Sequence, residues 1–398
     1  MRLFFYELKK HWTWPVLLII GVLGILTWLA FLLPQVRDYN ANYGNIYGDL
    51  QNEMFAQYGI TLSVEELADF DIAGRRATLE ADMDALIAAE PIFAQYGIRT
   101  FHDYRNTLAY DTDGMNEEQL LKYRADRAIM DNTIRDVRSQ WLGLDRIEGY
   151  YVLFLERNIG MSRNGYSPVI TRAENHYIHT DERNLTRYAI HDIFSYYAMV
   201  TGVYAIAAVI LLTSPLVVTD RYRGMTAMQY SSSKGRSLLK LQGAACLFSA
   251  TLLGLLLVAI SFGLFFALTD AGQYWQAYIG AFDRGIVLYD ILFSQYILIL
   301  GAMVVALCVG TAGLAFVLSR YSSNLITLML KLVPLGIAIT WIAESSIHLA
   351  LVSINTVFSV WFPANYEAPE IILCSAVMII GMVLAFIVAA RERRVDVR

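Results

Sequence analysis

Residues 220–240 have the sequence DRYRGMTAMQYSSSKGRSLLK and lie between two long apolar runs. In this stretch one acid, Asp220, stands among five basic residues: Arg221, Arg223, Lys234, Arg236 and Lys240. An excess of Lys and Arg in a short loop between membrane spans marks the cytoplasmic side. The stretch is therefore predicted to be a cytoplasmic loop, covering residues 219–240. The alternative is that its charges serve only to orient the protein.

The composition indicates a polytopic membrane protein, because 56% of the 398 residues are hydrophobic. The net charge of −5 is unevenly distributed. Residues 34–192 contain 26 acids and 16 bases, whereas the rest of the chain contains 10 acids and 15 bases. An acidic exterior domain and a basic cytoplasmic face follow from this asymmetry. All three cysteines lie in apolar segments, so no disulfide is expected in the exterior domain. Nothing indicates a nucleic-acid partner.

The first residues predict a surface helix followed by a span. Phe4, Leu8 and Trp12 recur at helical spacing among polar residues, so residues 1–14 are predicted to be an amphipathic helix on the cytoplasmic membrane surface. Its alternatives are passive anchoring and contact with a cytoplasmic partner. Residues 15–33 are apolar throughout and close to the roughly 20 residues that a transmembrane helix needs.

Residues 34–192 are predicted to form a mainly helical extracytoplasmic domain. The sequence FAQYGI occurs at residues 55–60 and again at 93–98, with Gly59 and Gly97 placed as left-handed helix ends. Each is followed by the spacing of a capping box, Ser63 with Glu66 and Thr100 with Asp103. A longer helix is predicted over residues 116–141. His176 and His179 are too few for a metal site and are expected at the surface.

Five further apolar segments complete a bundle of six predicted spans within residues 193–398: 193–218, 241–268, 291–318, 325–342 and 371–390. With this topology every basic cluster lies on one side, and both termini are cytoplasmic. The apolar stretch 345–363 cannot be a further crossing without reversing the arginine-rich tail, so it is predicted to be an extracytoplasmic re-entrant hairpin. The expected fold class is an all-α polytopic membrane protein, most simply placed in a bacterial plasma membrane.

Glu344 and His348, spaced i, i+4 near the outer end of the fifth span, form a candidate substrate path or gate. Ionisable pairs close to the hydrocarbon commonly face a cavity or another helix. The alternative is an interfacial hydrogen-bonded pair without such a role. The sequence contains no phosphate-binding loop and no protease or hydrolase signature, so neither catalytic residues nor a metal site is predicted, and the chain is not expected to be an enzyme.

The layout of a surface helix, one span, an exterior domain, and then SPLVVTDRYRGMTAMQYSSSKGRSLLKLQ before four further spans resembles the permease subunit of type-two (type V) ABC exporters. The residues that carry the resemblance are an acid–Arg pair, a Gly, a Ser-Ser pair and a Gly-Arg pair: Asp220, Arg221, Gly224, Ser232, Ser233, Lys234, Gly235, Arg236 and Lys240. Asp220 departs from the more frequent Glu of the family, and the exterior domain is larger than in compact members.

The resemblance implies that residues 219–240 contain a coupling helix seated on a separate ATPase. Its candidate contact residues are those named above from Asp220 to Arg236, together with Arg223. The expected partners are an ABC ATPase dimer that binds ATP and Mg²⁺, a second permease chain, either identical or homologous, and membrane lipid. The substrate is expected to be a peptide or a cell-envelope lipid.

Two other classes remain open at this stage. One is a membrane-anchored sensor whose exterior domain binds a peptide or envelope ligand without transport. The other is an ion channel or lipid-handling protein that uses no ATP, which the lack of a charged pore ring disfavours. A stoichiometric ATPase partner would indicate the transporter, and a kinase partner would indicate the sensor.

Overall fold

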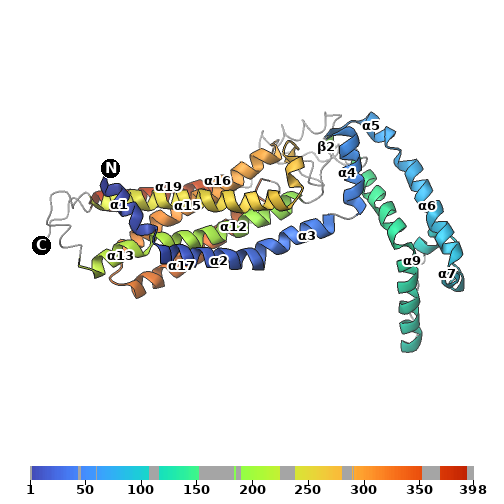
Figure 1. Ribbon diagram of the computed structural model, residues 1–398, viewed down its shortest axis with the longest axis horizontal. Coiled ribbons are helices and arrows are strands. Elements are labelled where there is room, and N and C mark those ends of the chain that lie inside the picture. Colours follow the sequence, from blue (N-terminus) through green and yellow to red (C-terminus); the bar gives the residue numbers. More distant parts are fainter. Residues whose placement is uncertain are drawn as a thin grey trace. The chain divides into compact units, whose positions relative to one another are not determined.

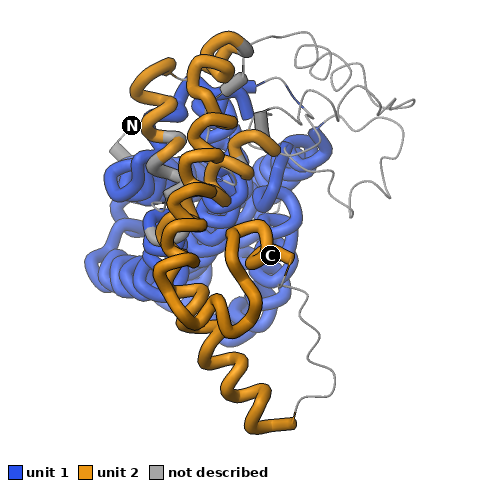
Figure 2. The backbone as a smooth tube through the Cα atoms, turned by 90° about the vertical axis from the view of Figure 1, so that its right-hand side faces the viewer, with its two compact units in different colours: residues 1–40, 163–177, 188–398 blue, residues 41–162, 178–187 orange. Residues whose placement is uncertain are grey.

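The computed structural model of the chain describes residues 2–43, 46–59, 61–106, 116–151, 183–184, 190–224, 238–279, 289, 291–351 and 368–391. The chain divides into two compact units, shown in blue and orange in Figure 2. Unit 1 comprises Met1–Asn40, Arg163–Tyr177 and Tyr188–Arg398, and unit 2 comprises Ala41–Ser162 and Ile178–Arg187. The described residues are almost entirely helical, in agreement with the predicted all-α class.

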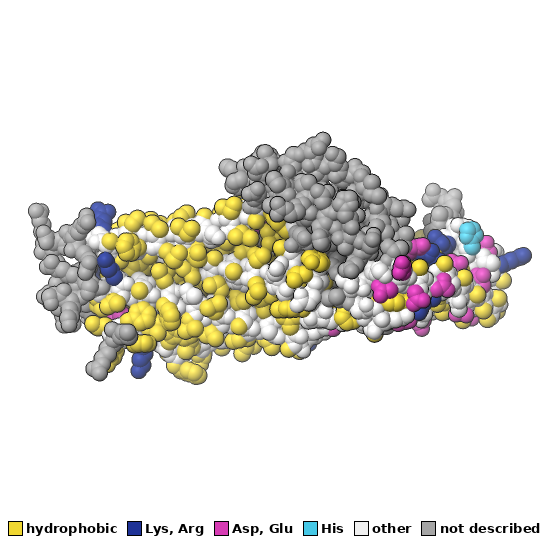
Figure 3. Space-filling model, turned by 90° about the horizontal axis from the view of Figure 1, so that it is seen from above, with side chains coloured by type: hydrophobic (Ala, Val, Ile, Leu, Met, Phe, Trp, Pro, Cys, Tyr) yellow, Lys and Arg dark blue, Asp and Glu magenta, His cyan; other side chains and the backbone are white. Residues whose placement is uncertain are grey.

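Unit 1 contains six helical segments that are long and apolar enough to cross a membrane (Figure 1). They are Trp14–Asn40, Ile190–Tyr222, Leu238–Leu268, Phe293–Arg320, Leu325–Ile347 and Pro369–Arg391. A helix lies at each predicted span; the fourth is shifted by two residues toward the C-terminus, and each of the others is longer than predicted at one or both ends. Many large apolar side chains on these helices are exposed, among them Ile326 and Leu330, and Figure 3 shows hydrophobic side chains over most of the visible face of the bundle. Such a surface is expected where lipid is the solvent.

The first span was predicted to end at residue 33, directly before Pro34, but the helix continues past this proline. Helix α2 (Trp14–Thr27) continues through the π-helical turn η1 (Trp28–Leu32) into α3 (Leu33–Tyr43). In η1 the N–H of Leu33 donates to the carbonyl oxygen of Trp28, so the helix is widened directly before the proline. A widened turn accommodates a residue that lacks an N–H and whose ring would crowd the preceding turn. The helix therefore passes the position at which the exterior domain was predicted to begin.

The second span is divided next to Pro215. Helix α12 (Ile190–Thr213) ends two residues before the proline, and α13 (Pro215–Tyr222) begins with the proline in its first turn. Ser319 donates its hydroxyl to the carbonyl oxygen of Ser214 at 2.8 Å. A neighbouring helix thus supplies a partner at the break, as is required for irregular backbone inside a membrane.

The closest helix contact joins α16 (Phe293–Arg320) and α19 (Pro369–Arg391) through glycines. A Cβ atom added to Gly310 would lie 2.6 Å from the carbonyl oxygen of Val377, and one added to Gly313 would overlap the backbone of Gly381. Small residues allow helix backbones to approach closely where no hydrophobic effect drives association. This glycine seam fixes the position of the last span.

The apolar segment 345–363 was predicted to form a re-entrant hairpin. Helix α17 (Leu325–Ile347) includes its first residues, so the fifth span is longer than predicted. The chain then turns with Leu349 and Leu351 at positive φ. The remainder of the predicted hairpin, from residue 352, lies outside the described residues.

Unit 2 is built on helices α6 (Ile72–Ala89) and α9 (Glu117–Tyr151), with the shorter helices α4 (Ile46–Tyr58), α5 (Val64–Asp69), α7 (Pro91–Gln95) and α8 (Phe101–Asn106). Strands β1 (Thr61–Leu62) and β2 (Arg183–Asn184) form one short antiparallel pair. One core cluster contains Met83, Phe93, Tyr104, Met130 and Trp141. The unit therefore has a hydrophobic core of its own.

The predicted turns of unit 2 are present. Gly59 and Gly97 have φ values of +88° and +70°. At the second turn the N–H of Ile98 donates to the carbonyl oxygen of Phe93 at 3.0 Å, which is the Schellman bond. The corresponding residue of the first turn, Ile60, lies outside the described residues.

Both predicted capping boxes form. Glu66 N–H donates to Ser63 Oγ at 3.2 Å, and Ser63 N–H donates to Glu66 Oε2 at 2.8 Å. Asp103 N–H donates to Thr100 Oγ1 at 3.2 Å, and Thr100 N–H donates to Asp103 Oδ2 at 3.1 Å.

Helix α9 is longer than the predicted 116–141. It continues to Tyr151 because Leu144 and Ile147 are buried in a second cluster with Met54, Leu62 and Phe70. The sequence pattern alone did not reveal this second cluster, because its partners lie about 75 to 90 residues earlier in the chain. His176 and His179 lie outside the described residues.

The close packing of the glycine seam predicts that one methyl group added there lowers the stability of the protein. Gly381→Ala would place a Cβ against the backbone of Gly310, so we expect it to lower stability by about 1–3 kcal/mol, as overpacking typically does. The measurement is the thermal unfolding midpoint of the full chain in detergent. The control is Gly263→Ala in the third span, where nothing lies within 4 Å of the added atom. Equal midpoints for the two variants would contradict the packing argument.

Candidate functional site

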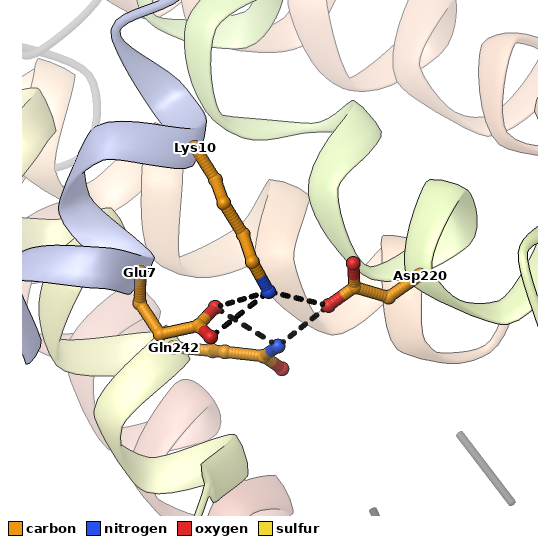
Figure 4. A network of polar contacts seen from close by, with 4 residues as sticks. All are labelled: Glu7, Lys10, Asp220 and Gln242. Carbon is orange, nitrogen blue, oxygen red and sulfur yellow. Dashed lines mark hydrogen bonds and ion pairs between the residues drawn. The ribbon is translucent and has the colours of Figure 1, made fainter. Parts of the chain in front are cut away.

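Four polar residues from three helices meet inside unit 1 (Figure 4). Glu7 and Lys10 come from α1 (Arg2–His11), Asp220 from α13, and Gln242 from α15 (Leu238–Leu268). Lys10 Nζ lies 2.9 Å from Glu7 Oε1 and 3.1 Å from Asp220 Oδ2. Gln242 Nε2 donates to Glu7 Oε2 at 3.2 Å and to Asp220 Oδ2 at 2.9 Å. We call these four residues the polar cluster.

The polar cluster is buried although three of its members carry formal charge. Glu7, Asp220 and Gln242 are at most 5% exposed. Charges away from water are tolerated only when they are paired and hydrogen-bonded. Lys10 contributes one positive charge between the two carboxylates, and the Gln242 amide donates to both. The two carboxylates together therefore receive donors from two side chains on different helices.

The pKa of Lys10 reflects this arrangement. Burial by itself lowers the pKa of the ammonium group, but the hydrogen bond and charge of Glu7, together with those of Asp220, outweigh burial and raise the pKa above its ordinary value of 10.5. Lys10 therefore stays charged throughout the physiological range.

A helix, α1, is present where the sequence predicted one, and its buried side mixes the half-buried Phe4 and Leu8 with polar residues. Glu7 and His11 are almost fully buried, whereas Leu3, Phe5 and Tyr6 are exposed. The indole N–H of Trp12 donates to Ser249 Oγ at 3.2 Å, and the ring of Phe4 meets that of Phe248 edge-on, so both residues attach this segment to α15. The polar residues of this side face inward because they find polar partners on α13 and α15.

Arg221 is bound within the same unit. Its guanidinium donates to the carbonyl oxygens of Ser322 at 2.5 Å and Arg320 at 2.8 Å. These carbonyls lie at and just beyond the end of α16, where backbone acceptors lack helical partners and a cation is favourable. Asp220 and Arg221, which the resemblance assigned to a partner protein, therefore make their described contacts within this chain.

The remaining residues of the predicted coupling site are distributed differently. Arg223 and Gly224 are exposed at the end of α13, with Gly224 at a φ of +68°. The side chain of Lys240 lies over the ring of Phe386 at 5.6 Å. The other five predicted residues lie outside the described part of the chain: Ser232, Ser233, Lys234, Gly235 and Arg236.

The predicted pair of Glu344 and His348 does not form in the described residues. Glu344 is exposed on the last turn of α17, whereas His348 caps that helix with ψ of 123° and so leaves the helical path. His348 Nε2 instead lies 3.4 Å from Asp192 Oδ1 in the first turn of α12. The helix ends between the two residues, so they do not lie one turn apart on one helical face; their role in a substrate path or gate stays a prediction.

A pocket of about 290 Å³ lies beside the polar cluster. Its polar lining includes Lys10, His11, Asp220 and Arg223, and its apolar lining includes Leu212 and Leu216. His11 Nδ1 lies 3.2 Å from the carbonyl oxygen of Leu212, and His11 Nε2 is buried without a hydrogen-bond partner among the described residues. The pocket therefore combines charged groups, one unsatisfied nitrogen and an apolar wall.

Comparison with known proteins identifies no relative: no family model matches the chain, and neither a curated protein nor a solved structure matches it. Within the described residues, no group of three or more His, Cys, Asp or Glu side chains could bind a metal ion. Functional arguments therefore depend on the geometry of unit 1.

The contacts of the polar cluster predict that the thermal stability of the protein depends strongly on Lys10. Lys10→Met leaves Glu7 and Asp220 buried without their cation, so we expect a clear loss of thermal stability in detergent. Adding Asp220→Asn should restore part of it, with a coupling free energy of about 1–3 kcal/mol in the double-mutant cycle. The control is Lys9→Met, because Lys9 is exposed. Additive effects of the two substitutions would contradict a buried ion pair.

His11 predicts how the docking of α1 depends on pH. Burial lowers the pKa of His11 below 6.5, although the Leu212 carbonyl and the Glu7 charge act in the opposite direction. A released α1 binds a proton more readily, so docking is strongest above pH 6.5 and weakens as the pH falls below it. We expect amide hydrogen exchange of residues 2–11, corrected for intrinsic rates, to be faster at pH 5.5 than at 7.5.

The matched control for this pH dependence is His11→Phe, which removes the titrating group. Glu7 and Asp220 also face His11, which is why the comparison stays above the range in which carboxylates usually titrate. The same pH dependence in the variant would assign the effect to another group.

Proposed function

We propose that the chain is the membrane-spanning permease subunit of an ATP-driven exporter of the type-two ABC class. In this proposal a separate ATPase dimer binds ATP and Mg²⁺ and pushes on residues 219–240. A second permease chain, identical or homologous, completes the transporter. Unit 2 faces the outside and takes part in handling a peptide or a cell-envelope lipid.

The observation that carries this proposal is the polar cluster, which links α1 to the end of the second span and the start of the third. Separating α13 would take both donors from the Asp220 carboxylate, and separating α1 or α15 would take at least one donor from a buried carboxylate, which is unfavourable away from water. A displacement applied to the loop between the second and third spans is therefore transmitted to both spans and to α1 together. That is the mechanical property required of a coupling element.

The distribution of charge supports the proposed orientation. Basic side chains gather at the end of the described bundle that carries α1 and α13: Lys9, Lys10, Arg221, Arg223, Lys240, Arg320, Lys331 and Arg391. Among the described residues, the acids at that end are Glu7 and Asp220, both within the polar cluster. Acids prevail at the opposite ends of the same helices: Asp38, Asp192, Asp270, Glu344 and Glu370. The positive-inside rule favours a cytoplasmic location for the basic end and hence for both termini.

Two arginines of the predicted coupling loop provide the test: Arg223, which is exposed, and Arg236, which lies outside the described residues. Arg221 is unsuitable because its guanidinium closes the end of α16, so the informative variant is Arg223→Glu combined with Arg236→Glu. We expect it to reduce copurification of a stoichiometric ATPase from native membranes by roughly tenfold, since each charge-assisted contact contributes about 1.5–3 kcal/mol. The unfolding midpoint should remain that of the unmodified chain.

The control is Arg124→Glu combined with Arg135→Glu, an equal charge reversal at two exposed positions of α9. Undiminished ATPase association in the double variant, or a purified complex without any nucleotide-hydrolysing subunit, would overturn the proposal. Copurification of a kinase in place of an ATPase would support the alternative, a membrane-anchored sensor.

A further inference from the structure

The pocket beside the polar cluster has two chemically distinct sides. Its polar side includes Lys10, His11 and Arg223, and two hydroxyl groups are added by Thr13 and Thr219. Its other side is apolar and includes Val16, Leu211, Leu212 and Leu216. Val16 lies in the first turns of α2, and Leu211 and Leu212 lie near the end of α12. The apolar side thus belongs to the ends of two spans, and the polar side lies where those spans end.

His11 specifies part of the ligand. A carbonyl oxygen can only accept, so the contact of 3.2 Å between His11 Nδ1 and the Leu212 oxygen places the ring proton on Nδ1. The other nitrogen, Nε2, is then an acceptor, and it is buried without a described partner. The His11 side chain is only 2% exposed and lines the pocket. A buried polar atom without a partner is rare, so a group with a hydrogen-bond donor is expected here.

The charged side chains around the pocket indicate the charge of the ligand. Asp220 lines the pocket, but its carboxylate already receives bonds from Lys10 and Gln242. Arg223 is exposed, and its guanidinium forms no ion pair with a described residue. The basic side chains listed above outnumber Glu7 and Asp220 at this end of the bundle, so the local field attracts an anion. Arginine in particular matches the geometry of a phosphate group.

We propose that this pocket binds the headgroup of an anionic phospholipid that carries free hydroxyls, of the phosphatidylglycerol type. The phosphate pairs with Arg223, a headgroup hydroxyl donates to His11 Nε2, and the start of an acyl chain lies on Val16, Leu211 and Leu216. A volume of about 290 Å³ is at the lower end of small-molecule pockets, about 300–1,000 Å³, which suits a headgroup better than a whole lipid. The proposal does not depend on the exporter function.

The site would also connect lipid composition to the polar cluster. Lys10 and Asp220 belong both to the pocket lining and to the cluster that attaches α1. A bound headgroup would therefore contact α1 and α13 at the same time. We expect the anionic lipid to stabilise the docked position of α1, because a ligand that binds only that arrangement shifts the equilibrium towards it.

The test uses the full chain in detergent, titrated with defined lipids and observed by native mass spectrometry. Phosphatidylglycerol is compared with phosphatidylethanol, which has the same charge but no headgroup hydroxyl. We expect phosphatidylglycerol to bind about fivefold more tightly, the effect of one hydrogen bond. Equal affinities in the unmodified chain would overturn the role of His11, whatever the behaviour of any variant.

Variants separate the two contacts. Arg223→Gln should weaken binding of both lipids by about tenfold, whereas Lys9→Gln, an equal loss of charge at an exposed residue of α1 outside the pocket lining, should change it less than twofold. His11→Phe should abolish the difference between the two lipids. Equal losses for Arg223→Gln and Lys9→Gln would reduce the effect to general surface charge and overturn the site.

A soluble competitor separates the lipid from a free phosphate ester. Glycerophosphoglycerol, the deacylated form of phosphatidylglycerol, has the same phosphodiester and headgroup hydroxyls without acyl chains, and we expect it not to displace the lipid at equal concentration. Displacement at equal concentration would overturn the lipid as the ligand, because the apolar side would then contribute nothing.

Discussion

The arrangement of unit 1 depends on the ion pair between Lys10 and Asp220, buried with Glu7 and Gln242. Burying charge is unfavourable unless each group finds its partners, so this contact is specific in a way that apolar packing is not. Apolar faces of membrane helices can slide or rotate against each other and against lipid at small cost. A buried carboxylate with two donors cannot be shifted by one helical turn without losing both.

Three other features position the spans around this contact. Glycines on α16 and α19 bring those helices into backbone contact. Prolines at 34 and 215 are accommodated by a π-helical turn and by a helix break. Tyr204 donates its hydroxyl to the carbonyl oxygen of Ile20 at 2.7 Å and so joins the first span to the second. Each feature either provides a backbone group with a hydrogen-bond partner or allows two helices to approach closely, in surroundings that offer little water.

At the end of the bundle away from the polar cluster, His348 after α17 contacts Asp192 in the first turn of α12. Ionisable residues outside the predicted loop therefore also connect spans. The second span therefore has a polar side-chain contact near each end, with α1 and α15 at one end and α17 at the other. A displacement at one end can be passed to the other, and the break at Pro215 between the two contacts is the natural place for bending. This property suits a protein that converts a push at one end into a change at the other.

Much of the architecture could be predicted from local pattern. The six spans follow from apolar runs of sufficient length, and the turns at Gly59 and Gly97 follow from the need for positive φ. The capping boxes at Ser63 and Thr100 follow from spacing alone. These features are determined within a few residues of the chain, so one sequence suffices to find them.

The site itself was only partly predictable. The sequence drew attention to Asp220 and Arg221, but not to their partners, and it predicted that α1 lies on the membrane surface without indicating that Glu7 and His11 are buried. Gln242, a lone amide near the start of the third span, was the available signal for a buried polar contact and was not used. By itself the sequence determined where helices begin, cross and turn, because those choices depend on local hydrogen bonding and hydrophobicity. The tertiary structure alone decided which charges meet, because Lys10 and Asp220 lie 210 residues apart and their pairing depends on how the helices pack.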